Sequence, residues 1–139
     1  MSVDTRVFVD TNIIVYALTK GPDGRHAKAR SILRTLLAED RSCVSTQVLQ
    51  ETFVTLTRKA GVSVDKALAD VDDLAKWPVF PVDVPAIREA GELMKTTRIS
   101  FWDALLVVSA RRMGAEALYT EDLNNGQVIA GVRVVNPFD

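Results

Sequence analysis

A regular alternation of short β-rich runs with longer helical segments constrains the fold most. Strands are expected at residues 6–9, 42–45, 79–82, 117–120 and 132–135. Helices are expected at 13–18, 26–37, 46–61, 64–77, 85–94 and 99–113, where apolar residues recur at helical spacing. Strands that alternate with helices in this way form a parallel sheet covered on both faces. We therefore expect an α/β protein, a three-layer α/β/α sandwich with a five-stranded parallel sheet.

Composition indicates one domain that occupies residues 1–139. Hydrophobic residues make up 47% and charged residues 25% of the chain, which is typical of a globular core and excludes extended disorder. The single cysteine, Cys43, excludes an internal disulfide, suits a reducing cytoplasm and is interpreted as a small core residue. The first residues lack a signal-peptide pattern, and the apolar stretch 13–18 is too short to cross a membrane, so we expect a cytoplasmic protein.

The charge balance argues against an indiscriminate grip on nucleic acid. Lys and Arg total 17, Asp and Glu total 18, and the net charge is −1. A broad basic face is therefore excluded, and any binding of nucleic acid must use a local basic patch and metal ions. The helix around His26 is one such patch, and it is interpreted either as a solvated helix face or as a contact for an RNA backbone.

Four acidic residues stand near the expected carboxyl ends of the strands. Asp10 directly follows the first strand, and Asp122 comes just after Thr120, which ends the fourth. Glu51 lies on the second turn of the helix after the second strand, and Asp103 lies in the first turn of the helix before the fourth. In parallel α/β folds ligands bind at this edge of the sheet, so we expect the four carboxylates to converge.

Each acid also has a purely structural interpretation. Asp10 can cap a helix, and Asp122 can occupy a turn. Asp103 can complete a capping box with Ser100, and Glu51 can face water on an amphipathic helix. However, the helix of Asp103 is apolar nearly all round, which predicts that this carboxylate is buried and needs a cation, a hydrogen-bond network or a metal.

The surroundings of the acids favour a hard metal ion. No Lys or Arg lies within three positions of Asp10, Glu51 or Asp103. Carboxylates gathered in one cleft repel each other unless a cation holds them together, and oxygen ligands suit Mg²⁺ or Mn²⁺. One cysteine and one histidine exclude a zinc pattern. The sequence thus predicts an acidic metal site able to support phosphodiester hydrolysis, without naming the substrate.

Four segments resemble, in order and spacing, the signature blocks of PIN-domain proteins, specifically the VapC-type toxins of type II toxin–antitoxin systems. They are FVDTNIIVYAL, STQVLQETF, ISFWDALLVVSA and LYTEDLNNGQ. The resemblance extends from residue 7 to residue 135 and implies a PIN-like sandwich. It also implies that Asp10, Glu51 and Asp103 hold the metal, and that Asp122, which matches the family's aspartate after the fourth strand, belongs to the same catalytic and metal-binding set.

The resemblance assigns supporting roles to several polar neighbours. Asn124 stands where family members often carry another acid or amide, and an amide is a weaker metal ligand, which puts a fully occupied second metal site in doubt. Thr11, Asn12 and Thr120 are candidates to orient the acids or their waters. Local capping of helices and turns is the alternative interpretation of these three residues.

The activity implied by the resemblance is Mg²⁺-dependent endoribonucleolytic cleavage, with in-line attack by an activated water on an RNA phosphodiester. Mn²⁺ is expected to substitute. The implied partners are an RNA substrate, a small antitoxin protein whose tail covers the acidic cleft, and a second copy in a homodimer.

Three other functions remain to be separated from this one. A catalytically silent PIN-fold module that binds RNA or protein would have broken acidic positions. A receiver-like signalling domain would carry a second acid beside Asp10, where this chain has Thr11. A haloacid-type phosphatase would carry an acid in place of Asn12.

Overall fold

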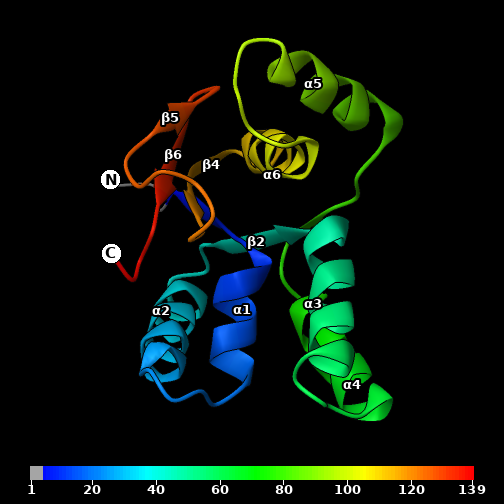
Figure 1. Ribbon diagram of the computed structural model, residues 1–139, viewed down its shortest axis with the longest axis vertical. Helices are drawn as coiled ribbons and strands as arrows, with labels where there is room; N and C mark the ends of the chain where they lie inside the picture. Colours follow the sequence, from blue (N-terminus) through cyan, green and yellow to red (C-terminus); the bar gives the residue numbers. More distant parts are fainter. Residues whose placement is uncertain (1–4) are drawn as a thin grey trace.

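The structure, a computed structural model, describes residues 5–139 as helices packed around one mixed sheet (Figure 1). The strands are β1 (Arg6–Val9), β2 (Ser42–Ser45), β3 (Val79–Phe80), β4 (Ala115–Tyr119), β5 (Val128–Ile129) and β6 (Val132–Val135). The helices are α1 (Thr11–Leu18), α2 (Arg25–Ala38), α3 (Thr46–Arg58), α4 (Val64–Leu74), α5 (Val84–Met94) and α6 (Phe101–Arg112). Within residues 5–139 no helix has the length and apolarity needed to cross a membrane.

The strand order places β1 inside the sheet. The order is β3-β2-β1-β4-β6-β5, and β1 pairs in parallel with β2 and β4. From β1 the chain passes through β2 to β3, and then returns through α5 and α6 to β4 on the other side of β1. Right-handed crossovers place the helices of the outward and return paths on opposite faces of the sheet, as Figure 1 shows for α1 and α2 against α6. The path therefore reverses direction between β1 and β4, the kind of position where α/β folds bind ligands.

The prediction of five parallel strands was wrong at one edge of the sheet. A sixth strand, β5, pairs antiparallel with β6. Ala130 and Gly131 join the two strands with φ values of 51° and 83°, the two positive angles of a type I′ hairpin turn. Asn-Gly is the usual sequence signal for this turn. Because Ala130 stands in place of Asn, the turn was not predicted from the sequence. The predicted bounds also shift, since β3 ends at Phe80 and β4 begins at Ala115.

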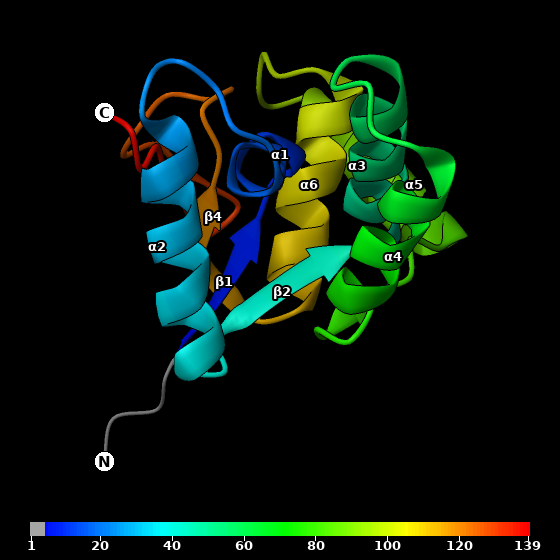
Figure 2. The same ribbon diagram turned by 90° about the horizontal axis from the view of Figure 1, so that it is seen from below.

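Short polar side chains define where the chain leaves the sheet. Five helices begin after an Asp or Ser whose side chain accepts a backbone N–H of the first turn. These caps are Asp10, Ser45, Ser63, Asp83 and Ser100. The first cap, Asp10, is the single residue between β1 and α1, and β2 lies beside β1 (Figure 2). The starts of α1, α3 and α6 are consequently fixed at one end of the molecule's central strands.

The core lies on both faces of the central strands. Phe8 of β1 and Leu118 of β4 are fully buried, and Ile14 of α1 and Val107 of α6 are buried in the same cluster. Cys43 in β2 is also fully buried, as predicted, and burial raises the pKa of its thiol to about 12. At neutral pH this thiol is protonated and acts as a small apolar side chain.

The β5–β6 turn supplies a test of the added strand. Gly131→Val forces a β-branched residue into a positive φ, so we expect the free energy of unfolding to fall by about 1–3 kcal/mol. Ala130→Gly removes a side chain from the left-handed region and should leave stability unchanged or raised. Urea unfolding measures both proteins, and wild-type stability in Gly131→Val would contradict the hairpin.

Candidate active site

Asp10 is the most deeply buried acid of the site, with 3% of its surface exposed. Its carboxylate accepts hydrogen bonds from the backbone N–H of Thr11 at 2.6 Å and from Thr120 Oγ1 at 2.8 Å. The pKa of Asp10 is raised overall from 3.8 to about 7, because burial and, to a smaller extent, the charges of Asp122 and Glu51 raise it more than the two hydrogen bonds lower it. The hydrogen bonds therefore compensate only part of the cost of placing this charge in the interior.

The first turn of α1 connects Asp10 to Glu51. Thr11 donates from its hydroxyl to Glu51 Oε1 at 3.0 Å, in addition to its backbone bond to Asp10. The other carboxylate oxygen of Glu51 accepts from Gln47 Nε2 at 3.4 Å, one helical turn earlier on α3. Both oxygens of this half-buried carboxylate thus have a neutral donor, which orients the side chain without neutralising its charge.

Thr120 connects Asp10 to Asp122. Its hydroxyl donates to Asp10 and accepts the backbone N–H of Asp122 at 3.1 Å. Asp122 is exposed, and together with Asp103 it lines a cavity of about 330 Å³. Desolvation raises the pKa of Asp122, the charge of Asp103 raises it further, and so do Glu121 and Glu51. The structure therefore brings all four predicted acids into electrostatic contact around the carboxyl ends of β1 and β4.

The predicted burial of Asp103 was wrong. Its side chain is half-buried, because the continuous buried part of α6 begins one residue later at Ala104. The backbone N–H of Asp103 donates to Ser100 Oγ at 3.1 Å, so the predicted N-cap is present. The apolar surroundings that suggested burial belong to the rest of the helix, whereas its first turn projects beyond the core.

The four carboxylates have no basic partner. Within residues 5–139, no ion pair joins Asp10, Glu51, Asp103 or Asp122 to a Lys, Arg or His side chain. In the same part of the chain, no three Asp, Glu, His or Cys side chains lie close enough together to hold a metal ion by themselves. A cation at this site would thus take only some of its ligands from the protein, and the rest from water or substrate.

Two asparagines stand beside the acids in different ways. Asn12, in the first turn of α1, has a buried side-chain amide that makes no hydrogen bond of ordinary length and angle, although it lies near enough to Asp122 for weak hydrogen bonding to lower the pKa of that carboxyl. Asn124 is exposed and lines the cavity that holds Asp103 and Asp122. Unsatisfied buried polar atoms are costly, so an amide with incomplete hydrogen bonding beside the acids fits a site that binds water or a ligand.

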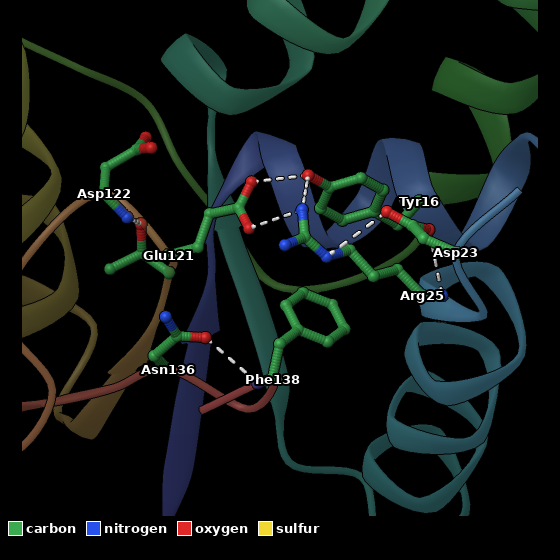
Figure 3. Close-up of polar contacts among 8 residues, drawn as sticks. Tyr16, Asp23, Arg25, Glu121, Asp122, Asn136 and Phe138 are labelled. Carbon is green, nitrogen blue, oxygen red and sulfur yellow. Dashed lines mark hydrogen bonds and ion pairs between the residues drawn. The ribbon is translucent and has the colours of Figure 1, made fainter. Parts of the chain in front are cut away.

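An aromatic and ionic cluster that was not predicted from the sequence holds the loop of Asp122 (Figure 3). Arg25 Nη1 donates to the Tyr16 hydroxyl at 2.7 Å and lies 3.3 Å from Glu121 Oε2. Tyr16 in turn donates to Glu121 Oε1 at 2.6 Å, and the guanidinium lies over the rings of Tyr16 and Phe138 at 5.3 and 5.6 Å. Since Glu121 directly precedes Asp122, this Arg25 cluster anchors the start of α2 to the loop after β4.

The pKa of Asp10 predicts an unusual dependence of stability on pH. The folded value of about 7 exceeds the unfolded value of 3.8, so the folded state binds more protons between these values. The free energy of unfolding should fall as pH rises from about 4 to about 7, by up to about 4 kcal/mol. Asp10→Asn should abolish this fall and be more stable than wild type at pH 8, as measured by urea unfolding in EDTA. Asp72→Asn, at an exposed position, serves as the control, and a fall of the same size in Asp10→Asn would contradict the assignment.

The Arg25 cluster gives a second prediction. Arg25→Met leaves Glu121 without its cation and removes the contacts of the guanidinium with two aromatic rings, so we expect the free energy of unfolding to decrease. Arg30→Met, which removes an exposed cation from the same helix, should change stability by less than about 0.5 kcal/mol. Thermal and urea unfolding of both variants decide the matter, and equal losses would show that the cluster has no specific role.

Comparison with known proteins identifies the fold family. Among solved structures, VapC20 of Mycobacterium tuberculosis, described as a Sarcin-Ricin loop cleaving toxin, is 26% identical with a TM-score of 0.66, over 84% of this chain and 89% of that chain. A toxin–antitoxin complex from Klebsiella pneumoniae is 19% identical with a TM-score of 0.71, over 96% and 98%. VapBC2 from Rickettsia felis, bound to a fragment of its promoter DNA, is 20% identical with a TM-score of 0.68, over 94% and 97%.

No curated protein matches the chain. The family model of the PIN domain, however, matches residues 7–128, which is most of the sequence. The receiver-like and haloacid-type alternatives are thereby excluded, and the chain belongs to the PIN domain family.

Proposed function

We propose that this protein is a Mg²⁺-dependent endoribonuclease and the toxin component of a VapBC-type toxin–antitoxin pair, acting on RNA in the cytoplasm. The observation that carries the proposal is a buried carboxylate, Asp10, at the carboxyl end of the central strand β1, in electrostatic contact with Glu51 and Asp122, which form no ion pair within residues 5–139. A site that is acidic, hydrogen-bonded by neutral donors and placed at the reversal of the sheet favours a cation over a basic side chain as its counter-charge.

The donor set fits a hard divalent cation. All the candidate donors are oxygens, from Asp10, Glu51, Asp103 and Asp122, with the Asn12 amide nearby. Mg²⁺ is commonly held by one or two carboxylates with several waters, so a ready-made group of three protein ligands is not required. Mn²⁺ shares the preference for oxygen and should substitute for Mg²⁺. When bound, the cation supplies Lewis acidity, which lowers the pKa of water and stabilises charge on a phosphodiester.

The protein's own groups would orient this chemistry. Thr11 bonds to Asp10 through its backbone N–H and to Glu51 through its hydroxyl. The Thr120 hydroxyl donates to Asp10 and accepts the backbone N–H of Asp122. The two threonines therefore hold the acids at fixed positions relative to one another. We propose that Asp10, Glu51, Asp103 and Asp122 together hold the metal, one or two of them directly and the others through waters bound to the metal. The neutral Asn124 is then a group that orients water rather than a strong ligand.

The proposed partners follow from the relatives and from the surface. The structural neighbours include toxin–antitoxin complexes, which supports a small antitoxin as partner, and a homodimer is proposed with it. Lys28, Arg30 and Arg34 are exposed on α2 and can contact an RNA backbone, whereas Arg25 of the same helix is engaged with Glu121. A catalytically silent binding module remains the second candidate, and the intact set of acids argues against it.

Cleavage of total cellular RNA by the purified protein tests the activity. With Mg²⁺ or Mn²⁺ we expect discrete fragments, and with EDTA we expect none. Asp10→Asn should lower the rate by at least about 100-fold, because electrostatic and metal-holding groups contribute on this scale. Asp72→Asn removes an exposed carboxylate on α4 and should cleave like wild type.

A binding measurement separates a silent module from a nuclease. In wild type, Mg²⁺ should raise the melting temperature at pH 7, because a cation relieves the cost of the buried Asp10 charge, and Asp10→Asn should lose most of this rise. Fragments that persist in EDTA or in Asp10→Asn would overturn the proposal. RNA binding without cleavage by metal-loaded, antitoxin-free protein would favour the silent module instead.

A further inference from the structure

A second cavity, of about 500 Å³, adjoins Glu51 and shares no lining residue with the cavity that holds Asp103 and Asp122. One wall is formed by α3 from Gln47 onward and by Lys59, the residue that follows the helix, and Trp102 at the start of α6 contributes from the other side. Thr11 and Glu51 belong both to this cavity and to the acid cluster. A molecule bound here therefore lies directly beside the proposed reaction centre.

Trp102 is a large aromatic side chain that is exposed to solvent. It is 61% exposed, and its ring meets Phe101 edge-on at a centroid distance of 5.2 Å and an angle of 77°. Its backbone carbonyl accepts a hydrogen bond from Gln47 Nε2 at 3.4 Å. An exposed indole next to Asp103 contributes little to the core, but it offers a fixed π face for stacking a planar ligand.

Gln47 provides the second, independent observation. Gln47 is 5% exposed, and its Nε2 donates to two acceptors, Glu51 Oε2 and the Trp102 carbonyl. These acceptors fix the orientation of the amide, because the reversed orientation would set oxygen against oxygen. The remaining Oε1 is buried without a donor. Gln47 lines the cavity, so a small shift of its side chain toward the cavity would let the N–H group of a ligand satisfy this oxygen.

The charge of the cavity completes the description of its ligand. Lys59 is the basic residue of the lining, and it stands at the far end of α3 from Glu51. The walls between them are neutral, with Gln50, Thr55 and the half-exposed Val54. This arrangement suits a flat, neutral group with N–H donors near Gln47 and an anionic group near Lys59.

We propose that this cavity, the Trp102 subsite, binds one unstacked nucleobase of a single-stranded RNA next to the phosphodiester that is cut. The base stacks on Trp102 and donates an N–H to Gln47 Oε1, and a neighbouring phosphate lies near Lys59. The inference rests on the proposed nuclease function and narrows its substrate to RNA loops and single strands. A peptide could use the apolar wall, but the stacking face, the unpaired acceptor and the cation together favour a nucleotide.

Steady-state cleavage of a single-stranded RNA that contains the mapped cleavage site tests the subsite. Trp102→Leu should raise KM by about 5- to 100-fold, the range expected for loss of one base–aromatic stack, and should change kcat less. Trp102→Phe keeps an aromatic face and should stay within a few-fold of wild type. Trp77→Phe, which alters the other, partly buried tryptophan, is the matched control. The same RNA annealed to its complement should not be cut.

Tryptophan fluorescence supplies a readout that does not depend on cleavage. With Asp10→Asn protein, single-stranded RNA should quench the emission saturably, and the Asp10→Asn, Trp102→Leu double variant should lose that quenching. Cleavage by wild type with an unchanged KM in Trp102→Leu would overturn the subsite and leave the nuclease function intact. Quenching that depends on Trp102, without cleavage by wild type, would support the subsite and reject the nuclease function. Quenching by an antitoxin-tail peptide but not by RNA would also overturn the proposal.

Discussion

The burial of the Asp10 carboxylate at the end of β1 is the interaction on which the rest of the site depends. The strand lies between β2 and β4, and the backbone N–H of Asp10 is bonded to the Tyr119 carbonyl at 3.0 Å, so the residue cannot withdraw to solvent without disrupting the sheet. Hydrogen bonds from Thr11 and Thr120 leave its pKa near 7, so they do not offset the loss of water. A chain selected for stability alone would place a neutral residue here. The retained charge is explained best by a ligand that supplies the missing positive charge.

Unpaired acids inside and outside the site differ in their exposure to water. Within residues 5–139, seven acids elsewhere form ion pairs with Lys or Arg, namely Asp23, Glu39, Asp70, Asp73, Glu89, Glu92 and Glu121. The other acids of this range that lie outside the site and form no ion pair are all exposed, whereas Asp10 is buried and Glu51 and Asp103 are half-buried. Glu121 is the informative case, because it is adjacent to Asp122 in sequence. The charge of Glu121 raises the pKa of Asp122. Arg25, which forms an ion pair with Glu121 but with none of the four site acids, offsets that charge. The fold thus neutralises the acid next to the site and leaves the site's own carboxylates available.

Features encoded locally were predictable from the sequence, and those that depend on distant contacts were not. The periodicities located β1 and the order of the elements, and the caps Asp10 and Ser100 were readable because capping involves neighbouring residues. The β5–β6 hairpin was missed because Ala130 gives no turn signal. Asp103 is half-exposed because the core covers α6 only from Ala104 onward, and the spacing of apolar residues does not show where along a helix the core begins. The Arg25–Glu121 contact and the role of Gln47 join elements far apart in the chain, although the spacing of Gln47 four residues before Glu51 was a usable hint.

A protein with a net charge of −1 and an acidic cleft gains little long-range attraction for a polyanion. Contacts of the proposed nuclease with RNA would then be short-range. Among the described residues, the groups near the cleft that suit such contacts include the exposed indole of Trp102, the unpaired Gln47 oxygen and Lys59. Stacking and hydrogen bonding to a base require that the base has left its helix, which duplex RNA resists. The proposed nuclease would thus have only weak electrostatic attraction for RNA in general, and it would require an unstacked base next to the bond that it cuts. Together these two properties would restrict cleavage to a few sites among the RNAs of the cell.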